Sequence, residues 1–337
     1  MTRSKRGLLS GATAYALWGL FPLYWPLLEP AGALEILACR IVLSLIVVAL
    51  LLAVRRELRG LRTMDQGTVL RLCAAGVIIA LNWGAYIWGV NNGHVVETSL
   101  GYFINPLITV AFGVVLLHER LRRMQWAAVA LGALAVVILS VDYGRPPWLA
   151  LLLAVSFGTY GLIKKRTRAT APEGLLVEAA VLTVPALAVL GVLAGTGGAT
   201  WIGSAATPGH LLLLAAAGPA TAIPLLFFAA AATRLPLSTL GLLQYLAPVM
   251  QFAIGVLVRH EPMPPALLGG FSLVWLALAL LTVDAVRHRH GVPSCVTEPE
   301  VLDVGAHATQ PVGAGIGVAE IVPRREPYVS TSPSSNR

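Results

Sequence analysis

The feature that most constrains the fold is a run of about twenty mostly apolar residues between Glu97 and Trp126, because a helix of that length crosses a bilayer core of roughly 30 Å. Small, aromatic or polar residues recur in this run at steps of three and four, so they share one helical face: Tyr102, Asn105, Pro106, Thr109 and Gly113. Pro106 frees a backbone carbonyl near Tyr102, and lipid offers that carbonyl no donor. We therefore expect this face to point into the protein.

The composition is typical of a chain that crosses the membrane many times. Of its 337 residues, 57% are hydrophobic and only 12% are charged, which is too few charges to coat a soluble globule of this size. The net charge of +8 is compatible with a nucleic-acid partner, but the positions of the bases favour a lipid bilayer and no nucleic acid. The three cysteines lack the spacing of zinc sites, so neither a metal nor a cofactor is expected.

Apolar runs of membrane-spanning length recur along the chain. They predict an all-α membrane protein with ten transmembrane helices, at roughly 7–28, 34–54, 69–90, 97–117, 124–141, 147–163, 174–193, 210–232, 238–258 and 265–285. Beyond them, the chain is rich in Pro, Gly, Ser and Thr and has no hydrophobic periodicity. Residues 287–337 are therefore expected to form a disordered cytoplasmic tail.

A weak internal repeat relates the two halves of the chain. A shift of 142 positions, without a gap, superposes Pro106 on Pro248, Gly113 on Gly255, His118 on His260 and Glu119 on Glu261. A constant offset indicates duplication, so we assign five-helix repeats to residues 1–143 and 144–286. Because five is an odd number of spans, the second repeat enters the membrane from the opposite side, and the repeats are inverted. The His-Glu pairs lack a HExxH motif and are interpreted as solvated helix ends.

The basic residues predict the orientation. Lys and Arg in alternate loops number 18 on one side of the predicted spans and 2, Arg145 and Arg259, on the other. Cytoplasmic loops carry the excess of Lys and Arg in membrane proteins. Both termini are therefore expected on the cytoplasmic side.

Three segments resemble one transporter family. They are WGAYIWGVNNGHVVETSLGYFINPL (83–107), LHERLRRMQW (117–126) and FAAAATRLPLSTLGLLQYLAP (228–248), and they are similar to the RarD branch of the EamA-domain family in the drug/metabolite transporter superfamily. The resemblance covers residues 7–286. It implies a multi-pass permease of a small organic metabolite or drug in the plasma membrane, which is the inner membrane in bacteria.

The inverted repeat itself indicates a secondary transporter that works by alternating access, with proton coupling as one option. No GxSxG, Walker or GxGxxG motif is present, so an enzyme is not expected. The alternatives are a membrane channel, whose pore would also be lined by polar faces, and a membrane scaffold or receptor without transport. Pairing with a second copy of the chain as a homodimer is left open.

Candidate substrate-binding residues lie on the polar faces of five predicted spans. They are Tyr15, Trp18, Asn82, Tyr86, Tyr102, Asn105, Pro106, Tyr160, Gln244, Tyr245 and Pro248. Pro106 and Pro248 are predicted to interrupt equivalent helices around a site near the membrane midplane. The alternative is that these residues only pack or kink helices, or anchor them at the membrane interface.

Four of the charged residues in or at the predicted spans are candidates for binding, coupling or gating: Glu35, Arg40, Glu97 and Glu178. Arg40 lies inside the second span, where a charge costs about 2.5 to 3.5 kcal/mol even on lenient insertion scales, so it needs partners. We predict that it binds a negative or strongly polar substrate group, and that Glu35 or Glu178 takes up a coupling proton. The alternative is that a carboxylate from another helix, such as Glu97, neutralises Arg40 and holds the bundle together.

The predicted orientation can be tested with reporter fusions. A phosphatase that is active only outside the cytoplasm should be inactive when fused after Arg289, and a fluorescent protein at the same point should be bright. Fusions after Arg145 should give the opposite result. An active phosphatase after Arg289 would contradict both the ten spans and the inverted repeat.

Overall fold

The computed structural model describes residues 3–55, 64–117, 121–165, 167, 169–232, 234–235 and 237–287. Its long helices are α1 (Arg3–Gly19), α3 (Ala33–Arg55), α5 (Gln66–Asn91), α6 (Val95–Leu117), α7 (Arg123–Tyr143), α8 (Trp148–Lys165), α9 (Ala171–Thr196), α10 (Pro208–Ala232) and α13 (Pro265–Arg287). Shorter elements are α2 (Phe21–Tyr24), η1 (Trp25–Leu28), η2 (Gly203–Ala205), α11 (Leu237–Leu243), α12 (Leu246–Ala253) and the π-helical turn η3 (Ile254–Val258). The predicted tail, apart from Arg287 at the end of α13, and the His118-Glu119 pair lie outside the described residues.

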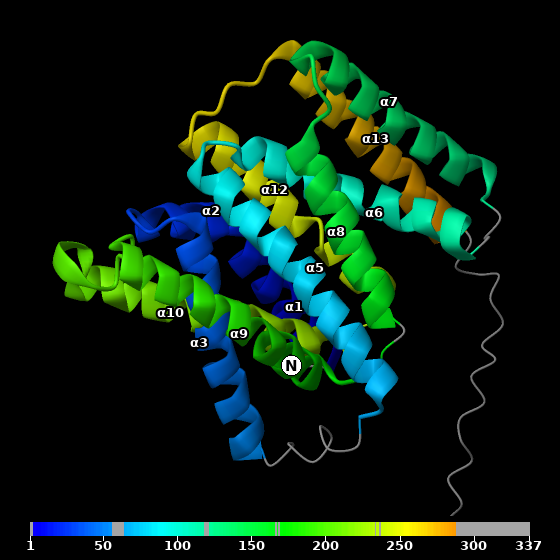
Figure 1. The fold of residues 1–337 in the computed structure, drawn as a ribbon. Coiled ribbons are helices and arrows are strands. Elements are labelled where there is room, and N and C mark those ends of the chain that lie inside the picture. Colours follow the sequence, from blue (N-terminus) through cyan, green and yellow to red (C-terminus); the bar gives the residue numbers. More distant parts are fainter. Residues whose placement is uncertain are drawn as a thin grey trace, which may run out of the picture. The chain divides into compact units, whose positions relative to one another are not determined.

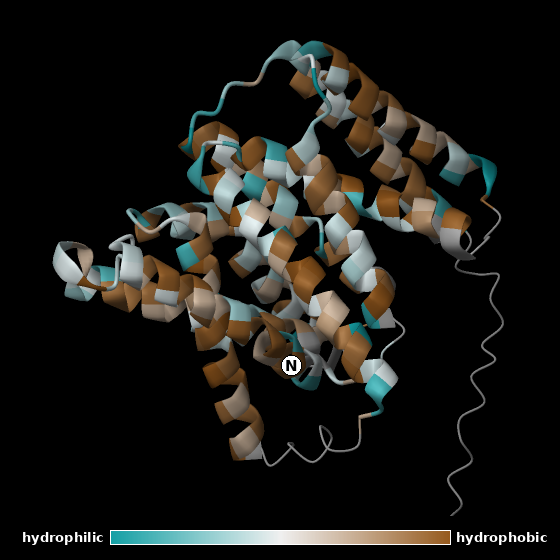
Figure 2. Ribbon diagram, viewed as in Figure 1, coloured by the Kyte–Doolittle hydropathy of each residue, from teal (hydrophilic) through white to brown (hydrophobic). Residues whose placement is uncertain are grey.

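The all-α membrane architecture is confirmed. Within the described residues there is no strand, eight helices are long and apolar enough to cross a membrane, and α8 adds a shorter apolar helix. Figure 2 shows hydrophobic residues along most of the helix lengths, with hydrophilic residues mainly at helix ends and connections. The chain is therefore a multi-pass membrane protein.

The first predicted span, 7–28, is not one continuous helix. α1 ends at Gly19, and the two short elements α2 and η1 follow it. Pro22 and Pro26 stand in the first turns of these elements, where a helix needs no backbone N–H donor. The prediction of an unbroken first helix is therefore wrong, because each proline starts a new helical turn.

The two repeat-related prolines also differ from the prediction. α6 stays one α-helix through Pro106, whereas the segment around Pro248 is divided into α11 and α12 at Gln244 and Tyr245. Gln244 precedes Pro248 by four residues, and a proline ring clashes with the helical carbonyl at that distance. The expectation of two equivalently broken helices is wrong for Pro106.

The helices pack in pairs that recur when the two halves are exchanged. α7 packs on α13 and α3 on α9, as Figure 1 shows for α7 and α13. α5 contacts α8, and the equivalent helices α10 and α1 contact each other. In the same way, the contact between α6 and α8 corresponds to that between α12 and α1. The contact between α5 and α9 corresponds to that between α10 and α3. Each helix of the first half lies about 142 residues before the helix of the second half that is equivalent to it.

Two glycines at equivalent positions allow close approaches between helices of the two halves. A Cβ atom on Gly218 of α10 would lie 2.7 Å from the Cβ of Leu43 and 2.9 Å from its carbonyl oxygen on α3. A Cβ atom on Gly76 of α5 would lie 3.3 Å from the Cα of Glu178 on α9. Small residues let helix backbones approach in membranes, where packing drives association.

Polar contacts fix the ends of several helices. Arg122, just before α7, forms an ion pair of 3.0 Å with Asp284 near the end of α13. Asp65 caps α5 by accepting hydrogen bonds from the hydroxyl and backbone N–H of Thr68. These hydrogen bonds hold the pKa of the Asp65 carboxyl below its ordinary value.

The close approach at Gly218 predicts a stability effect. Gly218→Ala should destabilise the protein by about 1 to 3 kcal/mol, because the new methyl group overlaps Leu43. Gly191→Ala is the matched control, since nothing lies within 4 Å of a Cβ atom there. Thermal unfolding followed by tryptophan fluorescence should show a lower midpoint for the first variant only. Equal midpoints would mean that α3 and α10 do not touch at this point.

Candidate functional site

Arg40 is the centre of the most polar part of the membrane interior. Its side chain is buried on α3, and Nε donates a hydrogen bond of 2.6 Å to the hydroxyl of Thr221 on α10. The guanidinium carbon lies 4.0 Å from the ring centroid of Trp83 and 5.2 Å from that of Trp25. Aromatic faces stabilise a desolvated guanidinium through the cation–π interaction.

Arg40 makes no ion pair within the described residues, and Glu97 lies near His94 instead, at 3.9 Å. Arg40 Nη1 is buried without a hydrogen-bond partner among the described residues. The same holds for Trp25 Nε1, and for the hydroxyls of Tyr86 and Ser44. Four groups that can donate hydrogen bonds, one of them charged, thus lack acceptors, and such groups are costly to bury unpaired.

Asn82 and Tyr102 join three helices beside Arg40. The Asn82 amide on α5 donates to the carbonyl oxygen of Leu153 at 3.0 Å and to Ser156 at 2.9 Å, both on α8. The Tyr102 hydroxyl on α6 donates to the Asn82 amide oxygen at 3.1 Å. The rings of Tyr86 and Tyr102 meet edge to face at 5.6 Å, and both tyrosines lie within electrostatic range of Arg40. Two predicted site residues, Tyr86 and Tyr102, therefore lie near Arg40, and Asn82 joins them through its hydrogen bond from Tyr102.

A row of aromatic rings continues from Tyr102 to a second polar group. Tyr102 contacts Phe157 at 5.9 Å, and Phe157 contacts Tyr160 at 6.2 Å, between ring centroids. The Tyr160 hydroxyl donates to Glu178 at 3.3 Å, and Lys164 forms an ion pair with the same carboxylate at 2.7 Å. Glu178 is 2% exposed. The structure therefore connects Tyr160 and Glu178, which were predicted separately.

A separate aromatic cluster joins α1 of the first half to α10 of the second half. Tyr15, Trp18 and Phe228 are in mutual contact, with ring centroids 5.3 to 6.0 Å apart. Gln251 on α12 donates to the backbone oxygen of Trp18 at 3.2 Å. Gln244 and Tyr245 form the break before α12, and Pro248 is buried in the first turn of α12. On α6, the amide oxygen of Asn105 is buried and has no hydrogen-bond partner among the described residues.

Glu35 lies in a different polar network from Arg40. Its carboxylate accepts hydrogen bonds of 2.7 Å from both the backbone N–H and the hydroxyl of Thr200. The Thr200 hydroxyl is also 2.7 Å from Nε2 of His210. Thr200 and His210 were missed by the sequence analysis, and no spacing or motif there marks them as partners of Glu35.

Glu261 was interpreted from the sequence as part of a solvated helix end, and this is wrong. Its two carboxylate oxygens accept hydrogen bonds of 2.7 Å each from the backbone N–H groups of Val95 and Val96. These groups open α6, so a carboxylate of the second half caps a helix of the first half. A negative charge at this position also complements the helix dipole.

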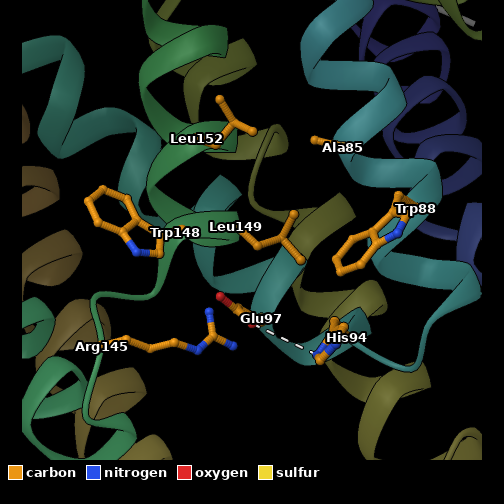
Figure 3. Close-up of a pocket in the computed structure, with 8 residues that line it drawn as sticks. All are labelled: Ala85, Trp88, His94, Glu97, Arg145, Trp148, Leu149 and Leu152. Carbon is orange, nitrogen blue, oxygen red and sulfur yellow. Dashed lines mark ion pairs between the residues drawn. The ribbon is translucent and has the colours of Figure 1, made fainter.

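Glu97 lines a pocket of about 380 Å³ between the ends of α5, α6 and α8. The other lining residues are Ala85, Trp88, His94, Arg145, Trp148, Leu149 and Leu152. In Figure 3 the Arg145 guanidinium is directed toward Glu97, and His94 flanks Glu97 on the other side. Within the described residues, no group of three His, Cys, Asp or Glu side chains is placed to hold a metal ion.

Comparisons with known proteins give the chain relatives over most of its length. Residues 5–141 match the model of the EamA-like transporter family. The chain is 58% identical over 286 residues to Protein RarD of Streptomyces exfoliatus, a match that covers 84% of this chain and 90% of that protein. It is 43% identical over 298 residues to the uncharacterized transporter YojE of Bacillus subtilis (strain 168), covering 86% and 98%.

Two further comparisons agree with these. Protein RarD of Escherichia coli (strain K12) is 38% identical over 286 residues, covering 84% of this chain and 96% of that protein. A solved crystal structure with 22% sequence identity covers 85% of this chain and 100% of that chain, with a TM-score of 0.54. At this identity the match supports the fold alone.

Proposed function

Because the chain belongs to the RarD branch of the EamA-like transporter family, we propose that it is a secondary transporter that carries a small organic metabolite or drug with an anionic group. The single observation that carries the choice of substrate is Arg40, a buried cation with an unpartnered Nη1 and no carboxylate partner among the described residues. A carboxylate, phosphate or similar acceptor on the substrate completes its hydrogen bonds.

The surroundings of Arg40 specify more of the substrate. Trp25 Nε1 and the Tyr86 and Ser44 hydroxyls supply further hydrogen-bond donors without partners among the described residues. Ser44 is four residues after Arg40 on α3 and so shares its helical face. Trp83 and Trp25 present aromatic faces to the guanidinium. A small anion with a flat or apolar body fits this combination of donors and rings.

The proposed mechanism is alternating access between two inverted five-helix repeats, residues 1–143 and 144–286. The recurrence of helix pairs on exchange of the two halves supports it, because a two-fold relation between repeats maps every contact onto another. The distribution of Lys and Arg supports cytoplasmic termini and a plasma-membrane location. A pseudo-twofold axis relates outward-open and inward-open forms of one site.

Proton coupling is proposed for Glu178. Glu35 and Glu178 occupy equivalent places in the two repeats within one position, and each is 2% exposed. They differ in partners, because Glu35 accepts from Thr200 whereas Glu178 pairs with Lys164. Protonation of Glu178 breaks an ion pair, which changes the energy of the surrounding contacts far more than protonation of a group held by neutral donors.

Substitution of Arg40 tests the substrate site. In proteoliposomes screened with organic anions, Arg40→Gln should lower the transport kcat/KM by about 30-fold or more, which corresponds to about 2 kcal/mol for the loss of a buried charge contact. Arg259→Gln is the matched control, because Arg259 is exposed. Normal saturable uptake by Arg40→Gln would exclude this site. Flux that never saturates would favour a channel, and no flux of any anion would favour a scaffold or receptor.

Substitution of Glu178 tests the coupling. Glu178→Gln should leave exchange of labelled for unlabelled substrate intact and should abolish accumulation driven by a pH gradient, because the variant cannot bind the proton. Glu35→Gln is the comparison at the equivalent position and should keep pH-driven accumulation. If Glu178→Gln responds to the pH gradient as the unsubstituted protein does, coupling through this carboxylate is excluded.

A further inference from the structure

The pocket around Glu97 has an apolar end and a charged end. Its polar and charged residues His94, Glu97 and Arg145 lie where α5 ends, where α6 begins and before α8 begins. Its apolar residues Ala85 and Leu152 lie six residues before the end of α5 and four residues after the start of α8, or about 9 Å and about 6 Å from those ends. The pocket therefore changes from polar to apolar along the helix axes, as a membrane interface does.

Two tryptophans flank the pocket. Trp88 is 49% exposed and Trp148 is 61% exposed, and Figure 3 shows them on opposite sides with Leu149 between them. Exposed tryptophans at the ends of membrane helices lie at the level of the lipid headgroups. The pocket thus faces the lipid where headgroup and acyl chain meet.

The charged end combines both signs. Oε1 of Glu97 is buried and accepts no hydrogen bond from the described residues, while Oε2 lies 3.9 Å from Nδ1 of His94. Arg145 has an exposed side chain whose guanidinium is directed into the pocket. A ligand with an N–H donor for Glu97 and an anionic oxygen for Arg145 would satisfy both groups.

We propose that this pocket binds a zwitterionic phospholipid whose headgroup carries a primary ammonium, that is, phosphatidylethanolamine. The ammonium donates to Glu97 Oε1, the phosphate accepts from Arg145, and an acyl chain lies along Leu149 and Leu152 between the tryptophans. Phosphatidylcholine is excluded by its trimethylated nitrogen, which has no N–H to donate. The distribution of Lys and Arg places this end of the helices in the outer leaflet. The site is independent of the substrate site at Arg40.

Lipid titration of the full-length protein tests the proposal. Purified protein in detergent is titrated with phosphatidylethanolamine, phosphatidylcholine or phosphatidylglycerol of identical acyl chains, and bound lipid is counted by native mass spectrometry. The ethanolamine lipid should bind about tenfold more tightly than the choline lipid, because one charge-assisted hydrogen bond distinguishes them. Equal binding of the two would overturn the proposal, as would a preference for the glycerol lipid.

Substitutions locate the site. Glu97→Gln should abolish the preference for ethanolamine over choline, and Arg145→Gln should weaken both lipids by about tenfold. Arg259→Gln is the control for loss of a positive charge on the outer face. Trp126 is an exposed tryptophan of α7 outside the pocket, so Trp126→Ala is the control for Trp148→Ala. If Glu97→Gln does not accumulate, Arg145→Gln and Trp148→Ala still decide the matter, because unchanged lipid binding in both would place the lipid elsewhere.

Discussion

The rest of the site depends on how one guanidinium is held inside the membrane without a counter-ion among the residues that the structure describes. The Arg40 charge lies against the rings of Trp83 and Trp25 and donates to Thr221. These contacts offset part of the desolvation cost, since a cation–π contact gives about 2 kcal/mol when desolvated and a charged hydrogen bond about 1.5 to 3 kcal/mol. The break after Gly19 is part of this arrangement, because it turns the chain so that η1 brings Trp25 over Arg40.

The helix packing is nearly symmetric between the two halves of the chain, but the polar side chains are not. Helix pairs recur on exchange of the halves, and Gly76 and Gly218 allow close approaches at equivalent positions. The polar residues do not recur in the same way. At the 142-residue offset, leucine stands opposite Arg40, proline opposite Asn82 and phenylalanine opposite Tyr86. The first half of the chain therefore carries most of the proposed binding groups, while the second half supplies the equivalent helices and the hydroxyl of Thr221.

Features within one helix were predictable from the sequence, and contacts between helices were not. Spacing along a helix put Asn82 and Tyr86 on one face, and in the structure both lie beside Tyr102. Trp25 and Thr221, the partners of Arg40, come from other helices. The periodicity of the sequence does not specify how those helices are rotated about their own axes. Pairs that are remote in sequence require the assembled bundle before they can be recognised.

Two carboxylates show the same limit at helix ends. Glu35 was predicted from its position as one of two candidates for a coupling proton, and its hydrogen-bond donors among the described residues are the Thr200 backbone N–H and hydroxyl. Glu261 was assigned to solvent, yet it caps α6. In both cases the acceptor is a carboxylate, which the sequence identifies. The donors are mostly backbone N–H groups, which every residue except proline carries. Sequence alone therefore cannot indicate which N–H group such a carboxylate binds.

These two carboxylates hold the two halves together at one end of the bundle. Glu35 accepts two hydrogen bonds from Thr200, and Glu261 accepts one each from Val95 and Val96, so that four hydrogen bonds connect the first half of the chain to the second. Under the proposed mechanism, opening this end gives those donors to water, at a net cost of about 1.5 kcal/mol per bond, the lower value for a hydrogen bond to a charged group. The sum, about 6 kcal/mol, is close to the roughly 5.5 kcal/mol that reverses a 1:99 equilibrium. Under the same mechanism, a substrate anion that completes the hydrogen bonds of Arg40 in only one state contributes about 2 kcal/mol of this difference, so binding at the centre shifts the opening equilibrium by about 30-fold.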